Sequence, residues 1–118
     1  MRASTQPAAE RVVQHQLDAY NARDHARFVA LYAEDVVVYR LPSLEPAFPG
    51  RAALAEFYRT QRFNLPALHA ELVNRMVIGN VVIDHERVHG VRPQPFDVAA
   101  SYRVVDGLIR TVWFFSGD

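Results

Sequence analysis

The chain has 118 residues, of which 13 are Lys or Arg and 13 are Asp or Glu, so its formal net charge is zero. This length suits one domain, residues 1–118, with one hydrophobic core, and the balanced charge argues against a protein that binds nucleic acid or an anionic membrane. The sequence has no cysteine, which excludes disulfides, thiolate chemistry and thiolate metal sites.

The first seven residues, Met1–Pro7, lack the apolar run of a signal peptide. No other stretch approaches the ~20 apolar residues that a membrane-spanning helix needs. We therefore expect a cytoplasmic protein that does not enter a membrane. Ser4 or Thr5 can cap a first helix, with Pro7 in its first turn.

The first predicted helix runs to about Asn21 and carries an apolar stripe on one side. Val13, Leu17 and Tyr20 recur at helical spacing along this stripe. Gln16 interrupts it, and two interpretations are open: a polar residue at the edge of the stripe, or a polar group directed into a cavity.

The middle of the chain predicts short elements separated by turns. Asp24 can cap a short second helix, and residues 36–39 form a short predicted strand. Residues 41–50 contain three prolines and are predicted to be a loop. A third helix is predicted from Arg51 to about Arg62.

The C-terminal half predicts four strands, and the first two form a hairpin. Residues 67–78 and 81–90 are joined by Gly79-Asn80, a dipeptide typical of tight hairpin turns. Such a turn places Arg75 opposite Asp84, a favourable pair of opposite charges. On the other face it pairs Ile78 with Val81, Met76 with Ile83, Asn74 with His85 and Leu72 with Arg87.

A second hairpin is predicted from residues 96–105 and 108–115, joined at Asp106-Gly107. A plain two-residue turn would place Arg103 opposite Arg110, which is unfavourable. We therefore predict a three-residue loop with a glycine bulge. One face of this hairpin would then carry Val98, Ala100, Tyr102, Arg110, Val112 and Phe114.

The last strand is apolar on both faces, whereas a strand with one solvent-exposed face should alternate apolar and polar residues. Trp113 and Phe115 lie on the face opposite Phe114. Three helices can cover only one face of the predicted sheet. We therefore expect a homodimer in which a second copy covers the outer face at Trp113 and Phe115.

The strand that follows the first hairpin turn carries a row of basic side chains that could bind a ligand or take part in catalysis. Side chains alternate between the faces of a strand, so His85, Arg87 and His89 share one face and Asp84 and Glu86 share the other. Two interpretations of the basic row are open. It is either the solvated end of a strand or an inward-facing site for an anion or an oxygen atom, in which Arg87 offers five donors and a permanent charge.

In the second interpretation Arg87 is the electrophile and a histidine is the acid or base. The charge of Arg87 would lower the pKa of His85 and His89 and leave neutral imidazole available. These histidines are about 13 Å apart on an extended strand, too far to share one metal ion. The sequence contains no Ser-His-Asp order, glycine-rich phosphate loop or zinc signature, and we expect no cofactor and no metal.

The predicted order of elements resembles the nuclear transport factor 2-like superfamily over nearly the whole chain. The markers are Asn21 and Asp24 between the first helices, Leu31-Tyr32-Ala33-Glu34-Asp35 before the first strand, and Gly50-Arg51 at the start of the third helix. The resemblance implies an α+β fold, a cone-shaped cystatin-like roll with three N-terminal helices packed on a curved, mainly antiparallel sheet.

Several small enzymes of this superfamily are similar to the chain: ketosteroid isomerases, SnoaL-like polyketide cyclases and dehydratases, and limonene-epoxide hydrolases. The isomerases use a tyrosine on the first helix, an aspartate on a sheet strand and an aspartate in a loop. The corresponding positions here hold Gln16, Ala100 and Arg40, so the resemblance does not extend to the isomerase apparatus.

The epoxide hydrolases carry a Glu-Arg-x-Asp motif that resembles Glu86-Arg87-Val88-His89. In that family the arginine bridges two aspartates, and here His89 and Phe114 stand in their places. Tyr39 matches a tyrosine that helps to hold water, and Leu41 falls near its asparagine partner. The resemblance implies that the arginine of this motif faces the cavity.

We therefore expect a SnoaL-like protein with an apolar pocket for a hydrophobic, oxygen-bearing compound. It would be a cofactor-free isomerase, dehydratase, cyclase or hydrolase, or else a non-catalytic ligand-binding or dimerisation module. The candidate catalytic residues are Arg87, His85, His89 and Tyr39. The candidate ligand-binding residues are Gln16, Tyr20, Phe57, Leu72, Asn74, Met76, Ile83, Val98, Tyr102, Val112 and Phe114.

Overall fold

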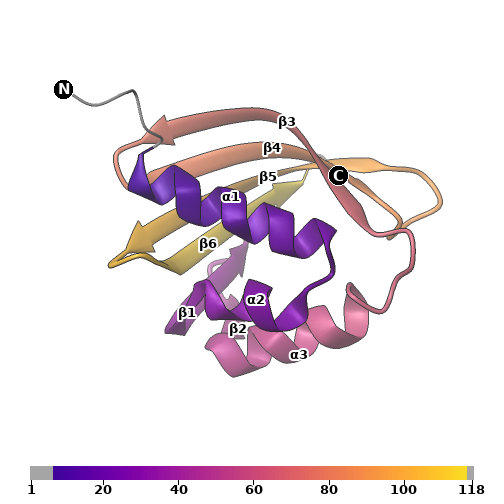
Figure 1. The fold of residues 1–118 in the computed structure, drawn as a ribbon, viewed down its shortest axis with the longest axis horizontal. Coiled ribbons are helices and arrows are strands. Elements are labelled where there is room, and N and C mark those ends of the chain that lie inside the picture. Colours follow the sequence, from indigo (N-terminus) through magenta and orange to yellow (C-terminus); the bar gives the residue numbers. More distant parts are fainter. Residues whose placement is uncertain (1–6, 117–118) are drawn as a thin grey trace.

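A curved six-stranded sheet with helices on its concave side makes up the fold, in a computed structural model that describes residues 7–116 (Figure 1). The elements are α1 (Ala8–Asn21), α2 (His25–Ala30), β1 (Tyr32–Arg40), β2 (Pro46–Pro49), α3 (Arg51–Gln61), β3 (His69–Ile78), β4 (Val81–His89), β5 (Phe96–Val105) and β6 (Leu108–Ser116). The strand order is β2-β1-β6-β5-β4-β3. This arrangement confirms the predicted α+β fold class and the predicted order of helices and main strands.

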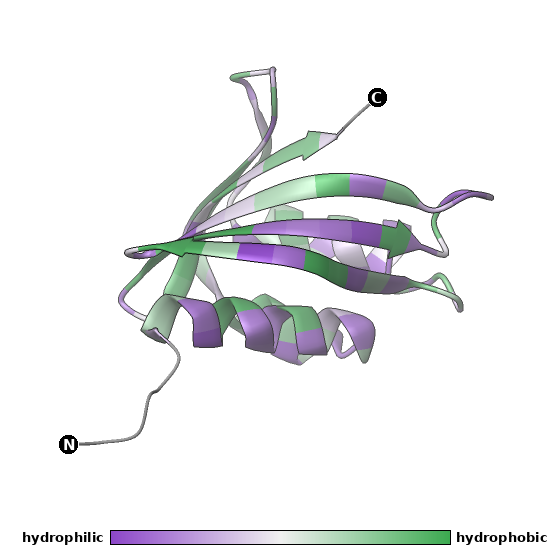
Figure 2. Ribbon diagram, turned by 90° about the horizontal axis from the view of Figure 1, so that it is seen from above, coloured by the Kyte–Doolittle hydropathy of each residue, from purple (hydrophilic) through white to green (hydrophobic). Residues whose placement is uncertain are grey.

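The strands pair antiparallel except for β1 and β6, which run parallel. Helix α1 crosses the face formed by β3 to β6, while α3 packs against β1 and β2. Figure 2 shows the two layers from another side, with hydrophobic and hydrophilic residues alternating along the strands. None of the helices within residues 7–116 is both long and apolar enough to cross a membrane.

The helical predictions agree with the structure. Val13, Leu17 and Tyr20 are buried on one side of α1, and the Asp24 side chain caps α2 by accepting a hydrogen bond from the backbone N–H of Arg27. Pro7 is the N-cap residue, immediately before the first turn of α1 and not inside that turn as predicted. The predicted caps Ser4 and Thr5 lie outside the described residues.

The sequence predicts a loop for residues 41–50, but residues 46–49 of this segment form strand β2. Residues 46–49 pair antiparallel with β1. Strand β2 lies at the edge of the sheet, where Pro46 and Pro49 are tolerated because one side of an edge strand makes no ladder hydrogen bonds. The prolines that indicated a loop are therefore compatible with this short edge strand.

The β3–β4 hairpin has the predicted register near its turn and a different one further away. Ile78 pairs with Val81, Met76 with Ile83, Asn74 with His85 and Arg75 with Asp84, as predicted. A bulge between Leu72 and Asn74 then shifts the register, so Leu72 pairs with Glu86 rather than with Arg87. Because one extra residue reverses the faces of a strand, Leu72 lies on the inner face.

The β5–β6 hairpin has the predicted bulge at a different place. A two-residue turn pairs Val105 with Leu108, and Asp106 and Gly107 both have positive φ, as a type I′ turn requires. The register shifts only beyond the turn, where Arg103 pairs with Thr111 and Arg110 is skipped. The two arginines therefore avoid one another, which was the reason for predicting a bulge. Val98, Ala100, Tyr102, Val112 and Phe114 share one face.

Two contacts tie α1 to the sheet and determine where the site can form. Asn21, at the end of α1, donates from Nδ2 to the Ala70 carbonyl at 2.9 Å and accepts from the Ala70 N–H at 2.8 Å. Nearer the start of α1, Gln14 accepts a hydrogen bond from Arg75 at 2.8 Å. Both ends of α1 are thus held against β3. The space next to the inner faces of β4 and β5 therefore lies between α1 and α3.

Candidate functional site

The orientation of β4 is opposite to the one predicted. Val82, Asp84, Glu86 and Val88 are buried, whereas the residues between them are only half-buried. Asp84 and Glu86 therefore face the helices, and Arg87 with its neighbouring histidines faces outward. The prediction that Arg87 and the histidines line the interior is wrong, as is the inward-facing arginine implied by the epoxide hydrolase motif.

The basic row has its own partners on the outer face, which explains this orientation. Arg87 donates from Nε to Asp97 Oδ1 at 2.9 Å and from Nη2 to Oδ2 at 3.2 Å, and His85 Nε2 lies 2.8 Å from Oδ2. The hydrogen bonds from Arg87, with a smaller effect from His85, lower the pKa of Asp97 to about 2. His89 lies 3.3 Å from Glu71. These pairs form where water can still solvate them, which avoids the cost of burying charge.

Several other predicted site residues share the outer face. Tyr39 pairs with Trp113 on β6, and Met76 pairs with Ile83. Neither Tyr39 nor Met76 lines the cavity described below. The predicted residues on this outer face are His85, Arg87, His89, Tyr39, Asn74, Met76 and Ile83. The structure therefore separates them from the interior.

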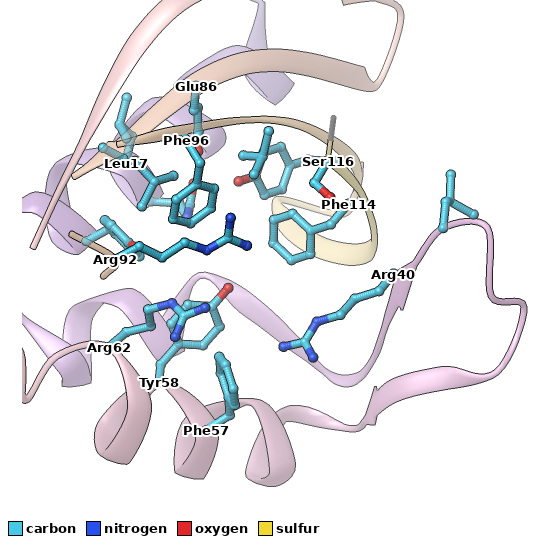
Figure 3. Close-up of a pocket in the computed structure, with 17 residues that line it drawn as sticks. Leu17, Arg40, Phe57, Tyr58, Arg62, Glu86, Arg92, Phe96, Phe114 and Ser116 are labelled. Carbon is cyan, nitrogen blue, oxygen red and sulfur yellow. The ribbon is translucent and has the colours of Figure 1, made fainter. Parts of the chain in front are cut away.

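A cavity of about 410 Å³ lies on the other side of the sheet, between α1, α3 and the inner faces of β3 to β6 (Figure 3). It is lined by Gln16, Leu17, Tyr20, Arg40, Leu41, Phe57, Tyr58, Arg62, Ala70, Glu86, Val88, Arg92, Phe96, Val98, Tyr102, Phe114 and Ser116. Its size suits a small organic molecule. The predicted residues that line it are Gln16, Tyr20, Phe57, Val98, Tyr102 and Phe114. Leu72 and Val112 face inward but pack in the core beside it.

Glu86 is the carboxyl group of this cavity. Its side chain descends from the middle of β4 (Figure 3), the residue is 6% exposed, and Oε2 has no hydrogen-bond partner among the described residues. Burial raises the pKa of Glu86 to about 8, with the Asp84 charge adding to the rise and the Arg75 charge opposing it. At neutral pH the carboxyl is therefore mostly protonated, and it can both donate and accept a proton.

Three tyrosines and one glutamine surround Glu86 with further polar atoms. Burial raises the pKa of Tyr20 and Tyr102 above its usual value and that of Tyr58 to about 12. Their hydroxyls therefore stay protonated and can donate hydrogen bonds at neutral pH. Gln16 is 5% exposed and its Oε1 has no described partner. Of the two interpretations of Gln16, its position matches the polar group directed into a cavity.

Three arginines stand at the mouth of the cavity. Arg40 comes from the end of β1, Arg62 from the residue after α3 and Arg92 from the connection between β4 and β5. Each guanidinium stacks on an aromatic ring: Arg40 and Arg62 lie 5.1 and 5.0 Å from the centre of Phe57, and Arg92 lies 4.0 Å from the centre of Phe96. The mouth is thus cationic, whereas the floor holds one buried carboxyl.

Glu86 and the mouth arginines were not among the predicted site residues. Arg87 and Asp97 are directly opposed in the β4–β5 ladder, and this pair of opposite charges was the available signal that the basic row belongs to the outer face. Arg62 and Arg92 lie outside strands and helices, where no periodic pattern indicates direction. Within residues 7–116 no three His, Asp or Glu side chains gather closely enough to hold a metal ion.

Solved structures with the same fold include proteins described as enzymes. A candidate ketosteroid isomerase from Kribbella flavida superposes with a TM-score of 0.81 at 21% identity, covering 94% of this chain and 78% of the other. A candidate polyketide cyclase from Sinorhizobium meliloti gives 0.76 at 20% identity, covering 92% and 99%. An epoxide hydrolase from Mycobacterium tuberculosis, similar to limonene-epoxide hydrolase, gives 0.74 at 18% identity, covering 92% and 82%.

These likenesses extend to the fold alone, because the identities are low. Other solved structures of this fold are described as cystatin-like, in agreement with the predicted roll. No curated protein matches the chain. The sequence model of the SnoaL-like domain matches residues 13–112, a range that covers at least part of every helix and strand and includes Glu86. The chain therefore belongs to the SnoaL-like domain family, within the nuclear transport factor 2-like superfamily.

Proposed function

We propose that the chain is a cofactor-free enzyme that moves a proton on a hydrophobic carbonyl compound bound in the cavity. The reaction class is isomerisation, or the enolisation that begins a cyclisation or dehydration. The observation that carries the proposal is the buried carboxyl of Glu86, whose Oε2 has no hydrogen-bond partner within residues 7–116. Arg87, His85 and His89 have no part in it, because they lie on the other face of the sheet.

Glu86 has the properties that such a reaction requires of its acid and base. With a pKa of about 8, about one carboxyl in ten is ionised at pH 7, and this fraction can take a proton from the carbon beside a carbonyl. The resulting acid can return the proton at another carbon. A catalytic pKa close to the working pH gives efficient transfer in both directions.

The hydroxyl groups around Glu86 can stabilise the negative charge that develops on the substrate oxygen. Tyr20, Tyr58 and Tyr102 line the same cavity as Glu86 and remain protonated donors. Donors held in a dry site stabilise an enolate more than water does, because they need no reorganisation during the reaction. The aromatic and aliphatic lining, including Phe57 and Phe114, favours an apolar substrate body.

The described neighbours support this reaction class over epoxide hydrolysis. Two of them are named for an isomerase and a polyketide cyclase, whose names refer to reactions at carbon. Epoxide hydrolysis needs one group to activate water and another to protonate the epoxide, and the described cavity lining contains a single carboxyl and no histidine. The alternative is a non-catalytic binding protein, which the same single carboxyl would also serve.

Exchange of carbon-bound hydrogen tests the proposal without knowledge of the natural substrate. 2-Tetralone, an apolar bicyclic ketone, is incubated with the protein in D₂O, and the loss of its α-proton signal is followed by NMR. We expect the protein to accelerate exchange and Glu86→Gln to slow it by at least about 100-fold. Glu56→Gln, which changes an exposed glutamate on α3, is the matched control and should keep the wild-type rate.

The possible outcomes separate the two functions. Equal exchange rates in wild type and Glu86→Gln would contradict the proposed role of Glu86. Binding of 2-tetralone without any acceleration of exchange would favour the non-catalytic binding protein. Calorimetry on the same samples measures the binding independently of exchange.

We also propose that a second copy of the chain covers the outer face of the sheet. Met76, Ile78 and Phe115 are at least half exposed there, and the Arg87–Asp97 pair gives the face charges of both signs, which suits contact with an identical surface. Sedimentation velocity should show a dimer that Phe115→Glu converts to a monomer. Leu44→Glu changes an exposed apolar residue outside the sheet and should leave the dimer intact; a monomeric wild type would contradict this proposal.

A further inference from the structure

We propose that the ligand of the cavity is an apolar oxo acid whose carboxylate binds among Arg40, Arg62 and Arg92 while its carbonyl oxygen reaches the floor near Glu86. This inference rests on the proposed function in assigning the cavity to a carbonyl compound. It adds the charge of the ligand and the direction in which the ligand lies.

The three guanidinium groups converge although they come from separate parts of the chain. In Figure 3, Arg40 reaches into the opening from one side and Arg92 from the other, with Arg62 on the same side as α3. The net charge of the chain is zero, so this cluster does not follow from a general excess of basic residues. Like charges gathered at one opening repel one another, and a bound anion would relieve that repulsion.

Four other arginines of the described chain are paired with carboxylates, in contrast to two of these three. Arg75, Arg87 and Arg110 each have a carboxylate oxygen within 3.1 Å, and Arg59 has one at 2.7 Å. Arg40 and Arg62 have no carboxylate partner within residues 7–116 and stack on the same ring, Phe57.

Stacking prepares these arginines to bind a carboxylate. An aromatic ring holds one face of the guanidinium and fixes its plane, while the N–H groups at its edge remain directed outward. A planar fork of this kind can bind a carboxylate through two parallel hydrogen bonds. Phe57 thus contacts both Arg40 and Arg62, and Phe96 contacts Arg92, whose guanidinium lies 4.0 Å from the centre of that ring.

The floor of the cavity suits a neutral part of the ligand rather than a second anion. The pKa of Tyr58 responds to groups at both ends of the cavity: the charges of Arg62 and Arg40 lower it and the charge of Glu86 raises it, while burial has the largest effect. Tyr58 therefore lies within electrostatic reach of both the mouth and the floor. A ligand with a carboxylate at one end, an apolar body and a carbonyl at the other matches this sequence of environments.

A pair of probes that differ only in charge tests the inference. 5-Oxo-5-phenylpentanoate and its methyl ester share a phenyl ketone, and their dissociation constants are measured by calorimetry at low ionic strength. We expect the acid to bind at least about tenfold more tightly than the ester. The double variant Arg40→Gln/Arg62→Gln should bring the two constants to within about twofold.

Arg103→Gln is the matched control, because Arg103 is exposed on the outer face opposite Val81 and Thr111. It removes one positive charge from the chain and should preserve the preference for the acid. Circular dichroism and thermal unfolding of each variant verify that the fold is retained. Raising the salt concentration should weaken the binding of the acid and leave that of the ester unchanged.

The outcomes distinguish this inference from the function on which it rests. If acid and ester bind equally well to the wild type, the mouth arginines do not select an anion and the inference is overturned, while the role of Glu86 in 2-tetralone exchange stands. If neither probe binds and 2-tetralone exchange is also absent, both proposals are overturned. A preference for the acid that survives in the double variant would also overturn the inference.

Discussion

Asp84 and Glu86 are two buried carboxyls on the same face of the same strand, and their surroundings are opposite. Asp84 is 0% exposed and receives two hydrogen bonds from Arg75, at 2.7 and 2.9 Å. Arg75 is also held by Gln14 and lies 3.6 Å from Glu10, both on α1. Glu86 has an unpartnered oxygen beside a cavity.

This difference separates a structural carboxyl from a functional one. A buried charge is stable only when it is paired and hydrogen-bonded, and the Arg75 contacts meet that condition for Asp84 while joining the sheet to α1. The Glu86 carboxyl is buried, its Oε2 has no partner in the described part of the chain, and so it holds its proton to higher pH. Groups of that kind are typical of reactive sites, and the comparison can be tested from both of its sides.

The largest effect on stability is expected for Asp84, the carboxyl that is paired with an arginine. Asp84→Asn should destabilise the protein by about 4 kcal/mol, because it leaves the partly buried Arg75 charge with only the more distant carboxylate of Glu10. Urea unfolding at pH 7 measures this loss. Asp106→Asn, an exposed change in a turn that asparagine tolerates, is the control and should have little effect. Similar stability of the two variants would mean that Asp84 is not the structural carboxyl.

A smaller effect of opposite sign is expected for Glu86→Gln. The folded pKa of about 8 lies above the unfolded value of 4.5, so the folded state binds more protons between these values and stability falls as pH rises through them. The variant removes that loss. It should match wild type below pH 4.5 and exceed it at pH 7 by on the order of 3 kcal/mol.

Urea unfolding of both proteins across this pH range checks the prediction. A wild-type stability that does not fall between pH 4.5 and 8 relative to Glu86→Gln would show that the carboxyl is ionised in the folded protein. The comparison between Asp84 and Glu86 would then lose its basis, because both groups would be charged.

The smallest effect is expected on the outer face, where Arg87 and Asp97 form a half-exposed pair. Solvent screens such pairs, and they add little to stability. Arg87→Gln should shift the urea midpoint no more than Arg103→Gln does, and its rate of 2-tetralone exchange should equal that of wild type. A large loss of exchange activity in this variant alone would show that Arg87 takes part in the reaction and would contradict its assignment to the outer face.

Much of the fold was predictable because local chemistry determines it. Asp24 caps α2 and Gly79-Asn80 forms a tight turn, and such signals depend only on neighbouring residues. The register close to that turn was also predictable, since the turn determines which residues pair. The bulge at residues 72–74 was not, because nothing in the local pattern marks the extra residue.

The site was less predictable because it depends on how strands pair across a longer connection. Residues 90–95 join β4 to β5 without a tight turn, so the sequence does not determine the register of these two strands. It therefore does not determine on which face of the sheet Glu86 lies. Alternation alone leaves two orientations of β4 equally possible. The Glu-Arg-x-His motif favoured the wrong one, because matching letters do not specify which face a strand presents.

The pKa of the Glu86 carboxyl is the most direct test of the account. Carbon-13 NMR of the glutamate side-chain carboxyls, followed from pH 4 to 10 and assigned by the signal missing in Glu86→Gln, measures it in the intact protein. The account predicts a midpoint of about 8. A midpoint near 4.5, the ordinary value for a glutamate, would show that Glu86 is ionised and solvated at neutral pH and would contradict its assignment as the proton-transferring group.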